Sequence, residues 1–508
     1  MSDKESNPIK RVSYKLTTVD REKNNLSVPI KGIETDFYNP IKRVEDKPLT
    51  KENKPILPYD IYSPKSIEEY AKKLIEKSTR DILPAEYKHY KGKGGLGQLL
   101  EKYYFLYEPN SVNGPDFKEA GVELKSSPIK KNKKGNDFSA KERLVLNIIN
   151  YIDICDEEFE SSTFLNKNKL ILLVLYLYEK GIDKLDYLFK FAQLVEIPKE
   201  DLKIIKEDWK TIVNKIRNGE AHKLSESDTN YLAACTKGAN KNSLRSQPYS
   251  TEPAKQRAFS FKVSYMTYLL NNYIIPGKKT YNDSIIKDIS QLEDKTFEEF
   301  VIEQININKA KDIDTLANLY GVECNKKSKN YASMVALAML GVKTKNSQEF
   351  EKANIKVKSI RVNSNGSIDQ SMSFPAFKFT EIVQEEWETS KLREMFLNTR
   401  YLFVIYKFDD EGILRLEKGM FWSIPYDDLE IHVKDVWEKT VNAINNGIKI
   451  IPRGNKRENN LPKSKDNKVA HVRPHGRDKE DTYLLPNGEE FTKQCFWLNK
   501  SYLIDQIS

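Results

Sequence analysis

Apolar and charged side chains alternate in a short stretch near residue 120. In Val122–Lys125 the apolar side chains point to one face of an extended chain, and those of Glu123 and Lys125 point to the other. This alternation predicts a strand with one buried face. Gly121 precedes the strand, and a hairpin turn that includes this glycine returns Asp116 to the side of Glu123.

Longer patterns predict further elements. A helical pattern begins at Ser66, which is the expected N-cap. The glycine-rich loop Lys91–Glu101 leads into another helix. It lacks the Gly-Lys-Ser/Thr ending of a Walker A loop, and it either holds a phosphate on its backbone amides or simply opens the helix. The apolar run over residues 170–178 predicts a buried strand, and Phe259–Tyr265 predicts a closing strand.

The bulk composition narrows the class of protein. The chain has 508 residues, which is long for a single core and predicts two domains. Its hydrophobic content of 39% supports folded cores, and its net charge of +9 is compatible with a nucleic-acid partner. The four cysteines lie far apart, the N-terminus is polar, and the longest apolar run is too short to span a bilayer. We therefore expect a soluble, cytoplasmic protein with no membrane partner and no zinc or disulfide framework.

The carboxylates of the predicted hairpin indicate a chemistry. Two carboxylates held side by side repel each other unless a cation separates them, and hard oxygen ligands favour Mg²⁺. Asp116 and Glu123 are therefore candidate metal ligands, and Glu101 on the preceding helix is a candidate third ligand. Lys125 is placed to orient or deprotonate a water beside such an ion. The pattern is typical of a metal-dependent phosphodiesterase site, and taken alone it also fits a solvated edge strand.

The chain divides into an arm and two larger parts. The hexapeptide Asn-Pro-Ile-Lys-Arg-Val occurs twice near the N-terminus, in a region rich in lysine and proline. We expect residues 1–60 to form a polar, basic arm that either is a plain extension or adds contacts to phosphate. The remaining chain is predicted to form a domain over 61–275, a linker over 276–290 and a second domain over 291–508.

The second half of the chain repeats the first. Trp209–Gly219 places Trp, Val and Ile at positions i, i+4 and i+7 of a helix that ends at a glycine. The segment returns as Trp437–Gly447, with six of its eleven positions identical. Residues 259–265 return as residues 496–502 with a Phe, a Ser and a Tyr retained. These recurrences predict a duplicated domain.

The hairpin itself returns over residues 349–358 with altered chemistry. Glu349 stands at the position of Asp116, Lys356 stands at the position of Glu123, and the next lysine of the alternation is retained. A protonated lysine cannot bind Mg²⁺. The second half should therefore fold like the first without cutting, which leaves binding, regulation or assembly as its role.

The complete pattern resembles a known family. The segments that carry the resemblance are Gly114–Lys125, Lys141–Tyr151 and Cys235–Asn240. Residues 91–150 and 207–265 resemble the MutH-type endonucleases, and the layout over about residues 65–508 resembles the Sau-type restriction enzymes that cut at GATC. The resemblance implies an α/β fold of two tandem restriction-endonuclease-like domains of the PD-(D/E)xK type. Each would be a mixed central sheet flanked by helices.

The resemblance also implies roles for individual residues in catalysis. The positions of Glu101, Asp116 and Glu123 match the ligands of the divalent metal. Lys125 matches the lysine that assists the attacking water, and Lys167 matches a lysine near the active site.

Other matches concern DNA. Lys237 and Gly238 match the base-reading loop, where small residues admit a loop to a groove and a lysine can donate to guanine. Lys93 and Gly94 match a second loop that lies against DNA. Ser260 stands where MutH has a base-wedging tyrosine, and Cys235 stands where it has an arginine. In the second half the loop over residues 471–477, with the cations Arg473 and Arg477, is either a second DNA-binding loop or a solvated charged loop.

The function implied is a type II restriction endonuclease that hydrolyses double-stranded DNA at GATC with Mg²⁺, before the G, leaving 5′-phosphates. The inactive second half would bind a second GATC. One intact site per chain implies self-association on DNA or sequential nicking, and a cognate DNA methyltransferase would be the companion enzyme. The alternatives are a MutH-like mismatch-repair strand-nicking endonuclease and a non-catalytic DNA-binding regulator.

Overall fold

The predicted hairpin strand lies inside a mixed sheet. The computed structural model describes residues 57–508 except 85–94, 109–113, 133–136, 239–241, 278–282, 324, 327, 329, 345 and 454–455. In the first half, β1 (Glu123–Lys131) lies between β2 (Phe138–Ala140), which is antiparallel to it, and β4 (Leu170–Leu177), which is parallel to it. β5 (Phe189–Glu196) is antiparallel to β4. The apolar run is thus a central buried strand, as predicted.

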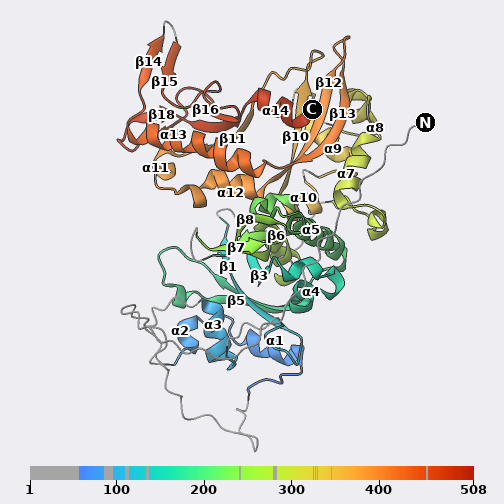
Figure 1. Ribbon diagram of the computed structural model, residues 1–508, viewed down its shortest axis with the longest axis vertical. Coiled ribbons are helices and arrows are strands. Elements are labelled where there is room, and N and C mark those ends of the chain that lie inside the picture. The colour runs from blue at the N-terminus through green and yellow to red at the C-terminus, as the bar shows by residue number, and fades with distance from the viewer. Residues whose placement is uncertain are drawn as a thin grey trace, which may run out of the picture. The chain divides into compact units, whose positions relative to one another are not determined.

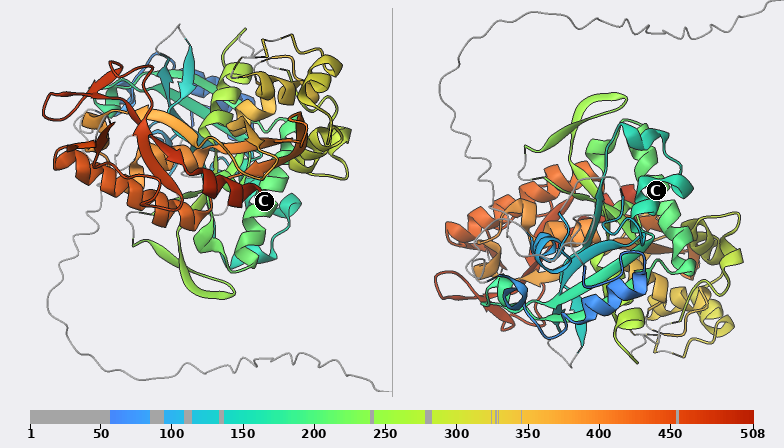
Figure 2. Two further views of the ribbon diagram at one scale, coloured as in Figure 1. Left: turned by 90° about the horizontal axis from the view of Figure 1, so that it is seen from above. Right: turned by 90° about the horizontal axis from the view of Figure 1, so that it is seen from below.

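Helices near the start of the described chain cover this sheet. α1 (Pro64–Lys72) packs on β5, and its apolar face joins a cluster with the strands β1 and β4 (Figures 1 and 2). The prediction of Ser66 as the N-cap is wrong. The cap is Ser63, whose side chain accepts a hydrogen bond from the Ser66 N–H, and Pro64 takes the first helical position, where its missing N–H costs nothing.

A second sheet of the first half has the order β3 (Leu144–Ile148), β9 (Arg257–Phe261) and β6 (Leu232–Thr236), all antiparallel. The helix α5 (Lys199–Arg217) buries Trp209, Val213 and Ile216 and is followed by Gly219, as the spacing predicts. The strand predicted over Phe259–Tyr265 is shorter, because β9 ends at Phe261 and α6 (Val263–Leu269) contains Tyr265.

The second half contains sheets of the same strand order and direction. β10 (Ile355–Val362) is parallel to β12 (Arg400–Phe408), and β13 (Leu414–Trp422) is antiparallel to β12, as in β1, β4 and β5. β19 (Gln494–Leu498) lies between β11 (Met372–Phe377) and β16 (Ala470–Pro474), as β9 lies between β3 and β6. The helix α13 (Lys434–Asn445) carries Trp437, and α14 (Lys500–Ile507) follows β19 as α6 follows β9. The structure therefore has the mixed α/β content that was predicted.

The other described elements complete the layers around these sheets. The remaining helices are α2 (Thr79–Ile82), α3 (Leu96–Leu99), α4 (Thr163–Asn168), α7 (Phe297–Asn306), α8 (Ile313–Leu319), α9 (Tyr331–Met339), α10 (Gln348–Ala353), α11 (Phe379–Ile382) and α12 (Lys391–Asn398). The hairpins pair β7 (Leu244–Gln247) with β8 (Ser250–Lys255), β14 (Ile450–Arg453) with β15 (Lys456–Asn459), and β17 (Thr482–Leu484) with β18 (Glu490–Thr492). Among the helices of the described residues, none is long and apolar enough to cross a membrane.

One hydrophobic core joins the two halves. Trp209 and Phe259 of the first half belong to the same cluster of buried side chains as Phe297, Phe350 and Leu402 of the second half. Residues 57–508 accordingly form one compact unit. The described part of the expected linker contributes to this packing, since residue Ile285 is buried in the same cluster. The boundaries 61–275 and 291–508 stay a prediction, and the arm over 1–60 falls almost entirely outside the described residues.

Candidate active site

The predicted turn brings the two carboxylates together. Phe117 and Val122 exchange both backbone hydrogen bonds, at 2.9 and 3.2 Å, and Gly121 between them has a φ of +66°, which suits a residue without a Cβ. The Leu124 N–H donates to Asp116 Oδ2 at 2.9 Å, and the Asp116 N–H donates to Glu123 Oε2 at 3.1 Å. The hairpin therefore fixes Asp116 beside the first residue of β1.

Two lysines face the Glu123 carboxylate. The Nζ of Lys125 lies 2.6 Å from Glu123 Oε1, and the Nζ of Lys167 lies 3.6 Å from the same oxygen. Lys167 ends α4 just before β4, and the parallel pairing of β4 with β1 places it next to Glu123. The Glu123 side chain is only 2% exposed, and burial raises its pKa although both lysines oppose this shift.

Glu101 approaches from a different element. It lies on a π-helical turn over Leu100–Tyr104 that continues α3. Burial, and then the negative charge of Asp116, raise the pKa of Glu101 to about 7, with Glu123 acting in the same direction and Lys125 against it. Gly97 allows this close approach, because a Cβ at that position would lie 3.3 Å from Ser126 Oγ on β1.

The structure adds Tyr107, which sequence reasoning missed. Its hydroxyl is buried and has no hydrogen-bond partner within the described part of the chain. Its ring packs edge-on against Phe117, with 5.2 Å between ring centroids. Burial raises the pKa of the phenol, and the charges of Asp116 and Glu101 raise it further, so the ring lies close to the carboxylates. Its position in the sequence offered no signal, since its burial depends on the fold of the hairpin.

Carboxylate oxygens are the ligands that a hard divalent cation prefers. In this structure, however, ion pairs and hydrogen bonds occupy some of these oxygens. The negative charge of Asp116 raises the pKa of both Glu101 and Glu123, so three carboxylates lie near one another. Across the described residues, however, no group of three or more His, Cys, Asp or Glu side chains is arranged to hold a metal ion. Lys125 occupies one oxygen of Glu123 and a backbone N–H occupies one oxygen of Asp116, so a metal would have to compete with these contacts.

The loop predicted to read bases, which contains Lys237 and Gly238, is exposed and lies more than 100 residues after the carboxylates in the sequence. Lys237 and Gly238 follow β6, and the Lys237 N–H donates to the Gln256 carbonyl at 2.7 Å. Lys237 lines a cleft of about 750 Å³ together with Arg143 and, from the second half, Arg393. Both signs of charge line this cleft. The other predicted loop, with Lys93 and Gly94, lies outside the described residues.

Among its described residues, the second half has no counterpart of the carboxylate cluster. Lys356 pairs with the second residue of β12, as Glu123 pairs with the second residue of β4, so the two side chains hold equivalent positions in their sheets. Lys356 is exposed, whereas Glu123 is buried. Glu349 lies on α10, and its carboxylate accepts hydrogen bonds from the backbone N–H groups of Ile285 and Ile286 at 2.9 and 3.1 Å.

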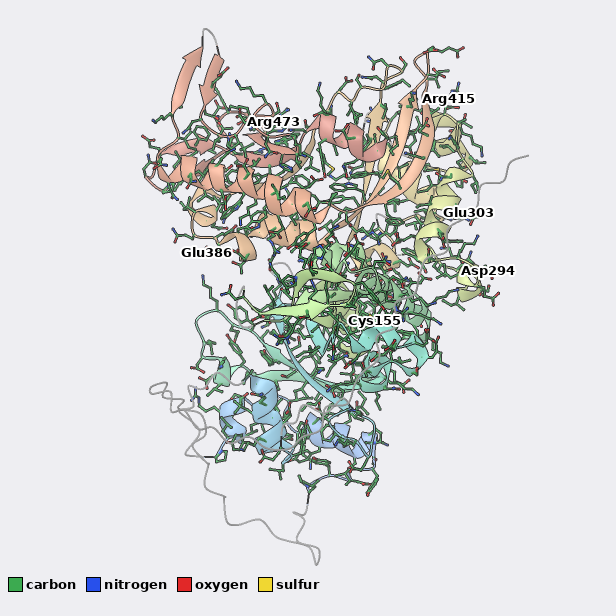
Figure 3. All side chains as sticks on the ribbon, in the orientation of Figure 1. Cys155, Asp294, Glu303, Glu386, Arg415 and Arg473 are labelled. Carbon is green, nitrogen blue, oxygen red and sulfur yellow. The ribbon has the colours of Figure 1, made fainter. Side chains whose placement is uncertain are left out.

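The basic loop predicted over residues 471–477 is in part a strand, because β16 continues to Pro474, and both of its arginines are exposed. Arg473 lies on β16, and Figure 3 labels it beside that strand. The Arg477 side chain is 88% exposed and lies 3.6 Å from a carboxylate oxygen of Asp481.

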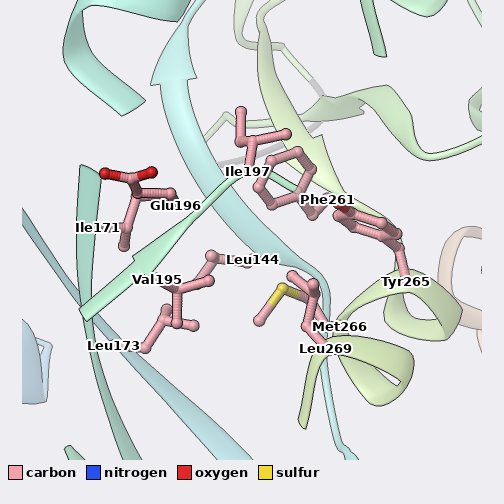
Figure 4. A pocket seen from close by; sticks show the side chains of 10 residues that line it. All are labelled: Leu144, Ile171, Leu173, Val195, Glu196, Ile197, Phe261, Tyr265, Met266 and Leu269. Atoms are coloured by element: carbon pink, nitrogen blue, oxygen red, sulfur yellow. The ribbon is translucent and has the colours of Figure 1, made fainter. Parts of the chain in front are cut away.

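A small cavity in the first half is not part of the site. Figure 4 shows it between β4, β5 and α6, lined by aliphatic side chains such as Leu173, Val195 and Met266. Its lining is almost entirely apolar, with Glu196 at its rim. An apolar space of this kind is a packing gap and offers no polar group to orient a substrate.

Comparisons with known proteins agree with the geometry. The family model described as DNA mismatch repair enzyme MutH matches residues 105–208, which include the hairpin, Lys125 and Lys167. The type II restriction enzyme Sau3AI of Staphylococcus aureus is 38% identical over 477 residues, covering 86% of this chain and 96% of that enzyme. The DNA mismatch repair protein MutH of Shewanella woodyi is 27% identical over 197 residues, covering 37% of this chain and 80% of that protein.

Proposed function

Because the chain belongs to the family of type II restriction enzymes that includes Sau3AI, we propose that it cuts both strands of double-stranded DNA at unmodified GATC, with Mg²⁺ as the metal. It is a site-specific deoxyribonuclease with a MutH-like restriction-endonuclease fold. The observation that carries the proposal is the cluster of Asp116, Glu123, Lys125 and Lys167 around one buried carboxylate. Cleavage before the G would leave 5′-phosphate ends.

In the proposed reaction the carboxylates bind the metal, and the lysines supply positive charge. Glu101, Asp116 and Glu123 would hold the divalent ion, and such an ion supplies positive charge for the phosphoryl oxygens and acidifies a water. Lys125 is held by Glu123 at 2.6 Å and by the Leu146 carbonyl at 3.3 Å, so its ammonium has a fixed position from which to orient the attacking water. Lys167, 3.6 Å from Glu123, adds a second positive charge for the scissile phosphate.

For the second half we propose an inactive copy of the same domain that binds a second GATC. The shared strand order and directions of its sheets support the duplication. Lys356 at the position of Glu123 supports the loss of catalysis, since a protonated lysine repels a metal ion. Arg473 and Arg477 would contact the DNA in this half, and Lys237 would contact DNA in the first half.

One intact site per chain also has a consequence for assembly. A palindromic target needs two cuts, so two chains must meet on the DNA or one chain must cut the strands in turn. The physiological companion would be a DNA methyltransferase that modifies GATC and so protects the cell's own DNA.

The test is cleavage of an unmethylated plasmid that carries several GATC sites, with Mg²⁺ or with EDTA. Wild type, Glu123→Ala and the matched second-half variant Lys356→Ala are compared. We expect discrete fragments ending at GATC, lost with EDTA and with Glu123→Ala and kept with Lys356→Ala. Loss of cutting in Lys356→Ala would contradict the inactive second half, and fragments ending elsewhere would contradict the assigned sequence.

A second candidate is a strand-nicking mismatch-repair endonuclease, which the match to the MutH family model favours. The extra half of this chain counts against it, because the MutH protein compared here aligns with only 37% of the chain. Nicked circles without linear fragments, and dependence on mismatch-repair proteins, would favour the nicker. Binding without any cleavage would instead leave a DNA-binding regulator, which the intact carboxylate cluster argues against.

A further inference from the structure

The two halves differ at one pair of equivalent positions on their second sheets. Ser260 of β9 pairs with Ala233 of β6, and Trp497 of β19 pairs with His471 of β16. Ser260 and Trp497 both lie two residues before the residue that caps the next helix, α6 or α14, so they occupy the same place in their sheets.

The neighbouring position differs as well. Two residues beyond the partner of Ser260 is Cys235, and two residues beyond the partner of Trp497 is Arg473. The first half therefore has Cys235 and Ser260, both fully buried, where the second half has Arg473 and Trp497. Arg473 is exposed, and Trp497 is partly exposed.

The side chains of Arg473 and Trp497 are in contact. The guanidinium carbon of Arg473 lies 4.3 Å from the centroid of the Trp497 ring, within the range of a cation–π contact. The indole Nε1–H of Trp497 points to the Arg473 carbonyl at 3.4 Å, which ties the ring to the backbone of the residue that it supports.

Histidines support the ring from other directions. His475 meets it edge-on at 5.5 Å, and the buried His471 lies nearly parallel to it at 6.4 Å between centroids. His471 is itself fixed, because its Nδ1 lies 2.6 Å from Asn499 Oδ1. The hydrophobic cluster of this half includes Phe496 and Leu498 on either side of Trp497 and does not include Trp497 itself.

This arrangement suits recognition better than it suits stability. An arginine side chain loses much rotational freedom when it binds, and a ring that already holds the guanidinium reduces that loss. An exposed, oriented guanidinium matches the O6 and N7 acceptors of guanine in the major groove. Arg477 follows β16, is exposed beside Asp481, and adds positive charge for the phosphates.

We propose that Arg473 reads a guanine of double-stranded DNA in the second half and that Trp497 is the positioning residue that holds its guanidinium for this contact. The inference rests on the proposed DNA binding by the second half and assigns it a base contact. The first half, with Cys235 and Ser260 at these positions, would then supply cutting and have no equivalent arginine contact.

The test uses the full chain with Glu123→Gln, so that DNA is bound and not cut, and measures dissociation constants for three duplexes. They contain GATC, GATC with 7-deazaguanine, which lacks the N7 acceptor, and an unrelated sequence. We expect the parent to bind the deaza duplex about 10- to 150-fold more weakly than GATC, the range for losing one hydrogen bond to a charged group. Arg473→Ala should lose most of this preference, Trp497→Ala should lose part of it, and Trp497→Phe should restore it.

The matched control is Arg477→Ala, a second exposed arginine that follows β16 and lies beside Asp481. It should keep the full preference for guanine over 7-deazaguanine. If Arg473→Ala weakens binding to all three duplexes equally, the base contact is refuted while DNA binding by the second half stands. If Arg473→Ala and Arg477→Ala leave every affinity unchanged, the proposed DNA binding through this segment fails, and the base contact fails with it. A Trp497→Ala variant with the preference intact would refute the positioning role alone.

Discussion

Replacing Lys352 by Met should destabilise the whole protein, because it leaves a buried charge without its partner. Lys352 on α10 lies 2.5 Å from Asp201 on α5, with side-chain exposures of 5% and 2%. Asp201 has one further contact, from the Tyr265 hydroxyl at 3.1 Å, and the lysine also lies 4.4 Å from the Tyr268 ring centroid. Breaking a buried ion pair on one side costs about 3–5 kcal/mol. We expect Lys352→Met to lower the free energy of unfolding by an amount in that range.

Replacing both partners should cost much less than replacing one. In the double variant Asp201→Asn/Lys352→Met neither position carries a charge, so we expect most of the loss to be recovered, to within about 1–2 kcal/mol of the parent. The control is Lys439→Met, which breaks an exposed i,i+4 pair with Asp435 at 2.8 Å and should cost less than about 0.5 kcal/mol. Urea unfolding followed by tryptophan fluorescence gives all four values.

The pH dependence of the free energy of unfolding provides a second test of the Asp201–Lys352 pair. Burial raises the pKa of Asp201, and Lys352 opposes that rise, so the pKa rises further in Lys352→Met. A carboxyl whose pKa is higher in the folded than in the unfolded state favours folding at low pH and loses that contribution as the pH rises through the folded pKa. The deficit of Lys352→Met should therefore shrink as the pH falls from 7 towards 5. A deficit below about 1 kcal/mol at pH 7, or a double variant no more stable than the single one, would refute this account of the pair.

Three further predictions follow from the site and the turns. Burial raises the pKa of Glu101 to about 7 in the metal-free protein, so below that pH Mg²⁺ must displace a proton to bind. The apparent affinity for Mg²⁺, measured by calorimetry, should fall about tenfold per pH unit below 7. Glu101→Gln should abolish this dependence on pH. Tyr107→Phe removes an unpaired buried hydroxyl and should stabilise the metal-free protein by about 1 kcal/mol in urea unfolding, and no gain would mean that the hydroxyl has a partner. Gly219 and Gly447 both have positive φ, but a Cβ at Gly219 would lie 2.7 Å from the Tyr249 carbonyl oxygen and one at Gly447 would meet nothing. Gly219→Ala should therefore cost at least about 1 kcal/mol more than Gly447→Ala, and equal costs would contradict the close contact.

The sequence predicted those parts of the site that depend on local structure. The turn at Gly121 and the alternation around Glu123 place Asp116 beside Glu123 through hydrogen bonds between neighbouring residues, so the printed pattern was sufficient. The position of Lys167 followed from a family resemblance, and the parallel pairing of β1 and β4 explains it. The error at Ser66 arose because Ser63 and Ser66 are both good caps, and Pro64 decides between them.

The remaining features depend on contacts that are distant in the sequence. Asp201 and Lys352 are 151 residues apart, and no local pattern marks either residue as buried and paired. Within the described residues the Tyr107 hydroxyl has no hydrogen-bond partner, and its burial depends on the packing of its ring against Phe117 of the hairpin. The alternation in Phe259–Tyr265 fits a strand, and the turn into α6 at Val263 is set by tertiary packing against the second half, where the Ser264 hydroxyl donates to the Lys352 carbonyl at 2.7 Å.

The single apolar cluster that joins the halves limits how the gene can be divided. If the gene were divided between the codons for residues 275 and 291, Trp209 and Phe259 would be separated from Phe297 and Phe350. These four side chains pack in one cluster. Each fragment made alone would present an uncovered apolar face to water and aggregate. When the two fragments are made together, their apolar faces are complementary, and the fragments can reassemble by burying these faces. The chain is therefore suited to a split nuclease, in which cutting begins only when two tagged fragments are brought together.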